Sequence, residues 1–92
     1  MPHYFFDLHD DRNAVDPEGK DLPDLEAAIA HALIETRYMI QANIAEFGRV
    51  DLRHHIDVRE GGEVVYVMRF EDAITVQRGA EVLSRPSALR SL

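Results

Sequence analysis

The sequence predicts an α+β fold, in which one long helix packs on one face of an antiparallel sheet of three or four strands. Three observations support this prediction. Residues 21–48 form a long amphipathic run, residues 3–9 place apolar side chains at every second position, and two alternating segments flank Gly61 and Gly62. The expected order of elements is therefore strand, helix, strand, strand.

The run of residues 21–48 carries one continuous apolar stripe. At 100° per residue, as in an α-helix, the members of the stripe fall within about 80° of Leu25. They are Leu25, Ile29, Ala32, Leu33, Thr36, Met39, Ile40 and Phe47. Asp21 three residues ahead of Asp24, Pro23, and the acids Asp24 and Glu26 are typical of a helix start, and Gly48 is typical of a helix end. We therefore expect one helix that begins at Asp21 and ends at Gly48, with its stripe facing the sheet.

The opposite side of this helix carries Ile34 and Tyr38, one turn apart. Two interpretations remain open for this pair. Isolated apolar side chains are normal on protein surfaces. Alternatively, the two side chains form a stripe that contacts a partner, and a second copy of the chain is the simplest candidate.

The aromatic segment of residues 3–9 is predicted to form the first strand. Its side chains alternate between the two faces, so that Phe5 points away from the core. The core set is Tyr4, Phe6 and Leu8. Residues 10–20 contain Asn, Asp, Pro and Gly in quick succession, which is typical of a loop, with a short extended piece expected around Ala14.

Gly61 and Gly62 predict a β-hairpin with a two-residue turn. This turn pairs Val58 with Val65 across the two strands. In that register, four side chains meet the helix: Ile56, Val58, Val65 and Val67. The same register gives the opposite face of the sheet an apolar surface formed by Phe5, Val64, Tyr66 and Met68. We expect this surface to be the main interaction site, and the helix pair Ile34 and Tyr38 the second one.

The segment after the hairpin allows two interpretations. Residues 70–76 either prolong the last strand beyond a kink or form a fourth short strand. Residues 77–92 have weak helical character around residues 80–83 and then a proline, with Ser and Arg in addition. We therefore expect a single domain over residues 1–76 and a flexible or weakly helical tail over residues 77–92.

The composition excludes several classes of function. Acids outnumber bases 17 to 10 and the net charge is −7, which argues against a nucleic-acid binder. The chain has no cysteine, hence no thiolate chemistry and no disulfides. No signal peptide or membrane-spanning run is evident, so we expect a soluble cytoplasmic protein. No motif of nucleophilic, nucleotide or zinc-protease chemistry is present, so we expect neither enzymatic activity nor a cofactor.

Five histidines raise the question of a metal site. The residues concerned alternate along the first two predicted strands and would share the outer face of the sheet if those strands pair: His3, Asp7, His9, His55 and Asp57. No specific zinc motif is present, and such alternation is also what a solvated sheet face looks like. From the sequence we therefore assign no metal ligand and no catalytic residue.

Three blocks in order carry a resemblance to a known family: MPHYFFDLHD, DPEGKDLPDLEAAIAHAL and IDVREGGEVVYVMRFEDA. The chain resembles a family of short uncharacterised bacterial proteins, a domain of unknown function, over roughly residues 1–73. Its members begin Met-Pro-x-Tyr-Phe-Phe-Asp, carry Asp-x-x-Gly before a Leu-Pro-Asp-Leu-x-x-Ala helix, and close a hairpin on Phe-x-Asp-Ala. The resemblance brings no binding or catalytic residues with it.

A shorter stretch, the aromatic strand followed by an acidic glycine loop and Leu-Pro-Asp-Leu, is also similar to the antitoxin partners of small RNA-cleaving toxins, although the strand order differs. The expected function is a small non-enzymatic protein-interaction module that self-associates as a homodimer, with a further protein partner left open. The alternative is an antitoxin-like regulator that binds a small toxin.

Overall fold

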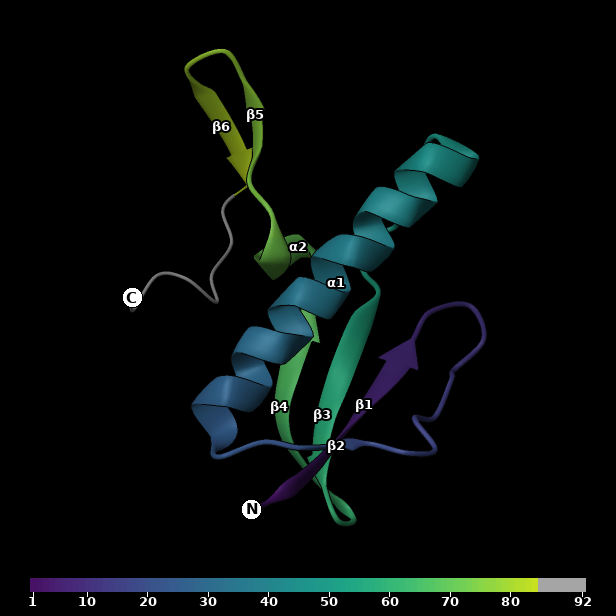
Figure 1. Cartoon of the computed structure of the whole chain (residues 1–92). Coiled ribbons are helices and arrows are strands. Elements are labelled where there is room, and N and C mark those ends of the chain that lie inside the picture. Colours follow the sequence, from purple (N-terminus) through teal and green to yellow (C-terminus); the bar gives the residue numbers. More distant parts are fainter. Residues whose placement is uncertain (85–92) are drawn as a thin grey trace.

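The computed structural model describes residues 1–84 of the chain. It shows a four-stranded antiparallel sheet, a long helix across one face of that sheet, and a small hairpin (Figure 1). The elements in chain order are β1 (His3–His9), β2 (Lys20–Asp21), α1 (Leu25–Phe47), β3 (His55–Glu60), β4 (Glu63–Arg69), α2 (Phe70–Ala73), β5 (Val76–Arg78) and β6 (Glu81–Ser84). The sheet order is β2-β1-β3-β4. The predicted α+β class is confirmed.

The fourth strand of the sheet is β2, which the sequence did not predict because two residues are too few to show alternation. It pairs His3 with Asp21 and Tyr4 with Lys20 at the start of β1. Further along β1, the backbone of Leu8 exchanges two hydrogen bonds of 2.8 Å with Ala14, where a short extended piece was expected. The loop between β1 and β2 therefore runs along the edge of β1.

Helix α1 begins and ends where local chemistry satisfies its free backbone groups. Asp24 is the N-cap, and its Oδ1 accepts a hydrogen bond of 2.9 Å from the backbone N–H of Ala27. Gly48 has φ of 69°, a left-handed conformation that costs glycine little, and its N–H donates to the carbonyl oxygen of Ile44 at 2.9 Å. The predicted end at Gly48 is thus confirmed, whereas the start lies at Asp24 and not at Asp21, which belongs to β2.

The core lies between α1 and the sheet. Its buried apolar members are Tyr4, Ala28, Ala32, Ile40, Ile56, Val58, Met68, Phe70 and Ala73. The predicted helix stripe is confirmed in its middle, where Thr36 is buried as well, but Leu25 is 37% exposed and Phe47 57%. A helix of 23 residues is roughly 35 Å long, whereas a strand of 7 residues spans roughly 23 Å, so the ends of α1 extend past the sheet.

The predicted two-residue turn is confirmed, since Glu60 pairs with Glu63, but the predicted register is wrong by one residue from Val58 onward, away from the turn. Val58 pairs with Tyr66 rather than Val65, and Ile56 pairs with Met68 rather than Val67, because the register shifts after Val58. The shift is a β-bulge, which places one extra residue in β4 and reverses the faces beyond it.

Consequently, two members of the predicted outer surface lie on the helix side of the sheet. Met68 is fully buried and Tyr66 packs against the core. Val67, which was expected to meet the helix, is 41% exposed on the opposite face. Val65 still packs against the core, as predicted.

The segment that follows β4 forms neither of the two structures predicted for it. Phe70–Ala73 is a single helical turn, α2, held to α1 by a hydrogen bond of 2.7 Å from Nε of Arg37 to the carbonyl oxygen of Ala73. Strands β5 and β6 then form a hairpin, which Figure 1 shows projecting from the body, so the weak helix expected around residues 80–83 is wrong. The rest of the predicted tail, residues 85–92, lies outside the described residues.

Candidate functional site

The outer face of the sheet, which points away from α1, carries charged and imidazole side chains rather than the predicted apolar surface. Phe5 lies there, but the guanidinium carbon of Arg59 lies 4.3 Å from its ring centroid and the ring of His3 packs edge-on at 4.9 Å. Val64 and Val67 are 48% and 41% exposed. The continuous apolar surface predicted on this face is therefore reduced to these two valines.

Asp7 forms a partly buried ion pair with Arg59 on this face. Its Oδ2 accepts a hydrogen bond of 2.9 Å from Nε of Arg59, and its Oδ1 accepts one of 2.9 Å from the backbone N–H of Asp16. Burial alone would raise the pKa of Asp7, but the hydrogen bonds from Arg59 and from the backbone outweigh it and hold the pKa below its ordinary value.

Asp16 fixes the loop that precedes β2. Its Oδ1 accepts hydrogen bonds of 3.1 Å from the backbone N–H groups of Glu18 and Gly19, and its Oδ2 accepts one of 3.1 Å from the N–H of Phe6. Burial would raise the pKa of Asp16, whereas the bonds from Gly19 and Phe6 outweigh it and lower that pKa. The Asp-x-x-Gly block of the sequence thus has a structural role.

Asp7→Asn is expected to lower the free energy of unfolding by about 2 kcal/mol at neutral pH, because an amide accepts weaker hydrogen bonds than a carboxylate. The pKa of Asp7 lies below its ordinary value of 3.8. The stabilisation of the folded state by the carboxylate is therefore fully present above pH 3.8. It is lost as the pH falls through the lower pKa that Asp7 has in the folded state. Urea denaturation of both proteins at neutral pH and in acid should show the difference shrinking in acid.

Asp11→Asn is the matched control for this measurement, because the Asp11 side chain is 94% exposed. We expect it to change stability much less than Asp7→Asn. Equal losses from the two variants would contradict a structural role for the Asp7 carboxylate.

Three of the five histidine and aspartate residues considered from the sequence come together at the end of β1. His9 pairs with His55 across β1 and β3, and their rings stack with centroids 4.8 Å apart and planes 16° apart. Nε2 of His9 lies 2.9 Å from Oδ2 of Asp57, and Nε2 of His55 lies 3.5 Å from Oδ1. We call these three residues the His9–Asp57–His55 cluster.

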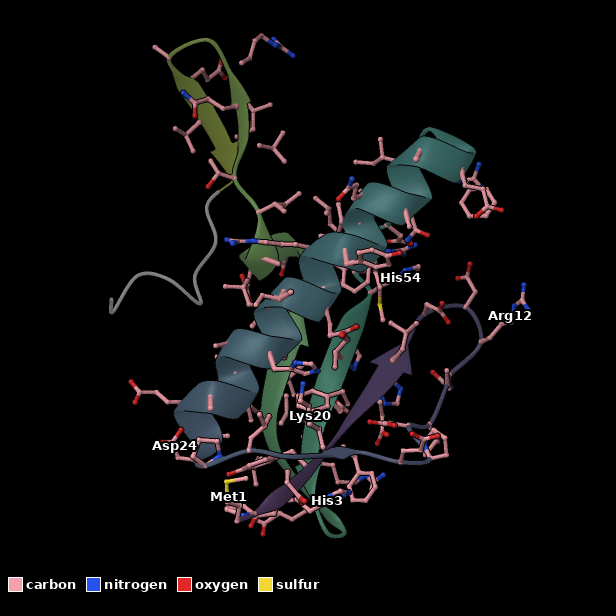
Figure 2. The ribbon with its side chains drawn as sticks, viewed as in Figure 1. Met1, His3, Arg12, Lys20, Asp24 and His54 are labelled. Atoms are coloured by element: carbon pink, nitrogen blue, oxygen red, sulfur yellow. The ribbon has the colours of Figure 1, made fainter. Side chains whose placement is uncertain are left out.

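The other two residues do not join this cluster. Asp7 is held by Arg59, as described above. His3 lies at the opposite end of β1, beside β2 (Figure 2), where its Nδ1 lies 2.6 Å from Oδ1 of Asp21. The hydrogen bond to Asp21 raises the pKa of His3.

His54 and His55 lie on opposite faces of the sheet, so they do not form the proton-transfer pair that their adjacency allows. The ring of His54 packs edge-on against Phe70, with 5.6 Å between centroids, and lies below α1 (Figure 2). Its Nδ1 is buried and has no hydrogen-bond partner among residues 1–84. Together with Tyr38 and Asn43 it lines a small depression of about 130 Å³.

A second groove of about 360 Å³ lies between α1 and β1. Phe6 and Met39 line it together with His31 and Glu35, whose Nε2 and Oε1 atoms lie 3.6 Å apart. The ring of His31 packs edge-on against Phe6, with 4.6 Å between centroids. The contacts of His31 with Phe6 and Glu35 are therefore part of the packing of the helix on the sheet.

The fold and these contacts define a small α+β domain with a partly buried ion pair and a histidine cluster on the outer face of its sheet. Within the described residues, no helix combines the length and apolar character that a membrane span requires. Residues 3–71 match the family described as Domain of unknown function (DUF6894), and the chain belongs to this family. Comparisons with curated proteins and with solved structures find no match.

Proposed function

We propose that this chain is a small interaction module, without catalytic activity of its own, that forms a homodimer through the outer side of α1. The observation that carries the proposal is the exposure of two large side chains one turn apart, Ile34 at 67% and Tyr38 at 70%. Both lie on the side of α1 opposite to the buried Ala32 and Thr36, so neither side chain is part of the core. Exposed apolar side chains that adjoin each other are typical of contact surfaces.

A twofold axis across this stripe would make the contact self-complementary. Two antiparallel copies of α1 would place Ile34 of each copy against Tyr38 of the other. Ala30 and Ala45 lie on the same side and are exposed, and their small side chains would let the helix axes approach to about 8–10 Å.

The outer face of the sheet supports dimerisation less well. The Arg59 guanidinium and the His3 ring cover Phe5, and Met68 is buried. Val64 and Val67 remain, and both belong to β4, which also carries the exposed charged residues Glu63 and Arg69. The change of register therefore favours the helix stripe over the surface that ranked first from the sequence.

Sedimentation at micromolar concentration tests the proposal. We expect the wild-type chain to sediment as a dimer and Tyr38→Glu as a monomer, because a carboxylate at the centre of the contact would lose its hydration. Val64→Glu is the matched control, since Val64 is also half-exposed but lies on the opposite side of the molecule, and it should remain dimeric. A wild-type monomer, or a Tyr38→Glu dimer, would refute the proposal.

The alternative function is an antitoxin-like regulator. It rests on the similarity of the aromatic strand, acidic glycine loop and Leu-Pro-Asp-Leu segment to antitoxins. It predicts a toxin gene beside the gene for this chain and co-purification of a small RNA-cleaving toxin. An isolated gene would count against it.

A further inference from the structure

The His9–Asp57–His55 cluster has the donor set and the spacing of a metal site. We propose that it binds one divalent transition-metal ion of the Zn²⁺ type, with one ligand atom from each residue. One such atom from each of the three side chains lies within 4.8 Å of the other two. The cluster is on the outer face of the sheet, away from the helix stripe, so the proposal stands independently of the proposed dimer.

The spacing of the ligand atoms fits a zinc-sized ion. Zinc binds imidazole nitrogen and carboxylate oxygen at about 2.0–2.2 Å in tetrahedral geometry, which sets neighbouring ligand atoms roughly 3.3 Å apart. Nε2 of His9 lies 2.9 Å from Oδ2 of Asp57, and Nε2 of His55 lies 3.5 Å from Oδ1, so each imidazole faces a different oxygen of the same carboxylate. One ligand atom from each residue lies within 4.8 Å of the other two, so one ion placed among them would be within reach of all three residues.

Asn13 orients the ring of His9 through a hydrogen bond. Nδ1 of His9 lies 3.0 Å from Oδ1 of Asn13, an amide oxygen that can accept a hydrogen bond from it. With Nδ1 as the donor to Asn13, Nε2, the atom that faces Asp57, is the one left to bind a metal ion. Hydrogen bonds of this kind, to the ring nitrogen that does not bind the metal, are typical of metal-ligating histidines.

Within residues 1–84, no arginine or lysine forms an ion pair with Asp57. Its side chain is 18% exposed, and within residues 1–84 its ion-pair contacts are with His9 and His55 alone. The neighbouring Asp7 is already neutralised by Arg59. Arg69 pairs across from His55, but its guanidinium lies 3.9 Å from the carboxylate of Glu71. A divalent ion bound by two neutral imidazoles would provide the missing positive charge.

The donor set also selects the class of ion. Two imidazoles and one carboxylate suit Zn²⁺ and its first-row neighbours, whereas Mg²⁺ and Ca²⁺ prefer sets made of oxygen alone. Three protein ligands leave a position for water. His55 also lines a depression of about 420 Å³ together with Val67 and Arg69, so the open position would face solvent.

Isothermal titration of the untagged full chain with Zn²⁺ tests the proposal. We expect one ion per chain, and binding at least tenfold weaker in His9→Ala, His55→Ala and Asp57→Asn. Mg²⁺ should give no binding under the same conditions. The midpoint of thermal unfolding should rise with Zn²⁺ in the wild type but not in these variants, because binding to the folded state alone stabilises it.

His3→Ala is the matched control, because His3 is an outer-face histidine of β1 outside the cluster, and its affinity for Zn²⁺ should equal that of the wild type. Asn13→Ala keeps all three ligands and should weaken binding about tenfold through the orientation of His9, which tests the site even if a ligand variant fails to fold. Absence of stoichiometric binding by the wild type, or binding that survives His9→Ala combined with His55→Ala, would overturn the proposal.

Discussion

Phe70→Ala is expected to lower the free energy of unfolding by about 3–5 kcal/mol. Phe70 is 1% exposed and is among the largest fully buried side chains of the described residues. Its ring contacts that of His54, and its backbone N–H donates to the His54 carbonyl oxygen at 2.9 Å. Truncation would leave a cavity where β4, α2 and α1 meet. Urea denaturation followed by circular dichroism at neutral pH measures the loss.

Phe47→Ala is the control of identical chemistry. Phe47 is 57% exposed because α1 extends past the sheet at this end, and it touches the guanidinium of Arg49 rather than the core. We expect a loss below about 0.5 kcal/mol, as for other surface substitutions. Comparable losses of unfolding free energy at the two positions would mean that the end of α1 packs against another part of the protein. This would contradict the conclusion that α1 extends past the sheet.

Gly19→Ala is expected to cost about 3 kcal/mol, for two reasons that add. Gly19 has φ of +67°, where any residue with a Cβ is strained by about 1–2 kcal/mol. A Cβ at this position would also lie 2.6 Å from Nε2 of His3 and 2.6 Å from the carbonyl oxygen of Tyr4. The carbonyl belongs to β1 and cannot move without disturbing its pairing with β2, so overpacking adds about 1–3 kcal/mol.

Gly48→Ala separates these two contributions. Gly48 has φ of +69°, almost the same as Gly19, but a Cβ there would have nothing within 4 Å. We expect a loss of about 1–2 kcal/mol from backbone strain alone. Urea denaturation of both variants gives the cost of the close contact as the difference between them. No difference would mean that the loop shifts to make room, and that Asp16 does not hold it rigidly.

Features that depend on neighbouring residues were predicted well from the sequence. The end of α1 at Gly48 and its buried middle around Thr36 follow from spacing and capping chemistry within the helix itself. The start was expected at Asp21 but lies at Asp24, because Asp21 pairs with His3 in the sheet. The exposure of Ile34 and Tyr38 follows from the same periodicity. Phe47 was placed wrongly because periodicity gives the direction of a side chain but not where the sheet beneath it ends.

The exact register between strands, which depends on distant residues, was not predicted. The bulge after Val58 depends on how β3 and β4 twist together on the helix, and a single extra residue sends Tyr66 and Met68 to the core side. The alternation of side chains did place His9, His55 and Asp57 on outer faces. Their convergence, with His3 left out, requires the register between β1 and β3, which are separated along the chain by the loop and the whole of α1.

The bulge in β4 has a consequence for how copies of this protein can assemble. Within the described residues, β4 is an edge strand of the sheet and exposes two valines. An exposed edge strand can pair with the same strand of another copy, and repeated pairing of this kind builds amyloid fibrils. A bulge increases the local twist and interrupts the regular row of backbone donors and acceptors, and the charged side chains of Glu63 and Arg69 flank the valines. We therefore expect this strand edge to be a poor template for fibril growth.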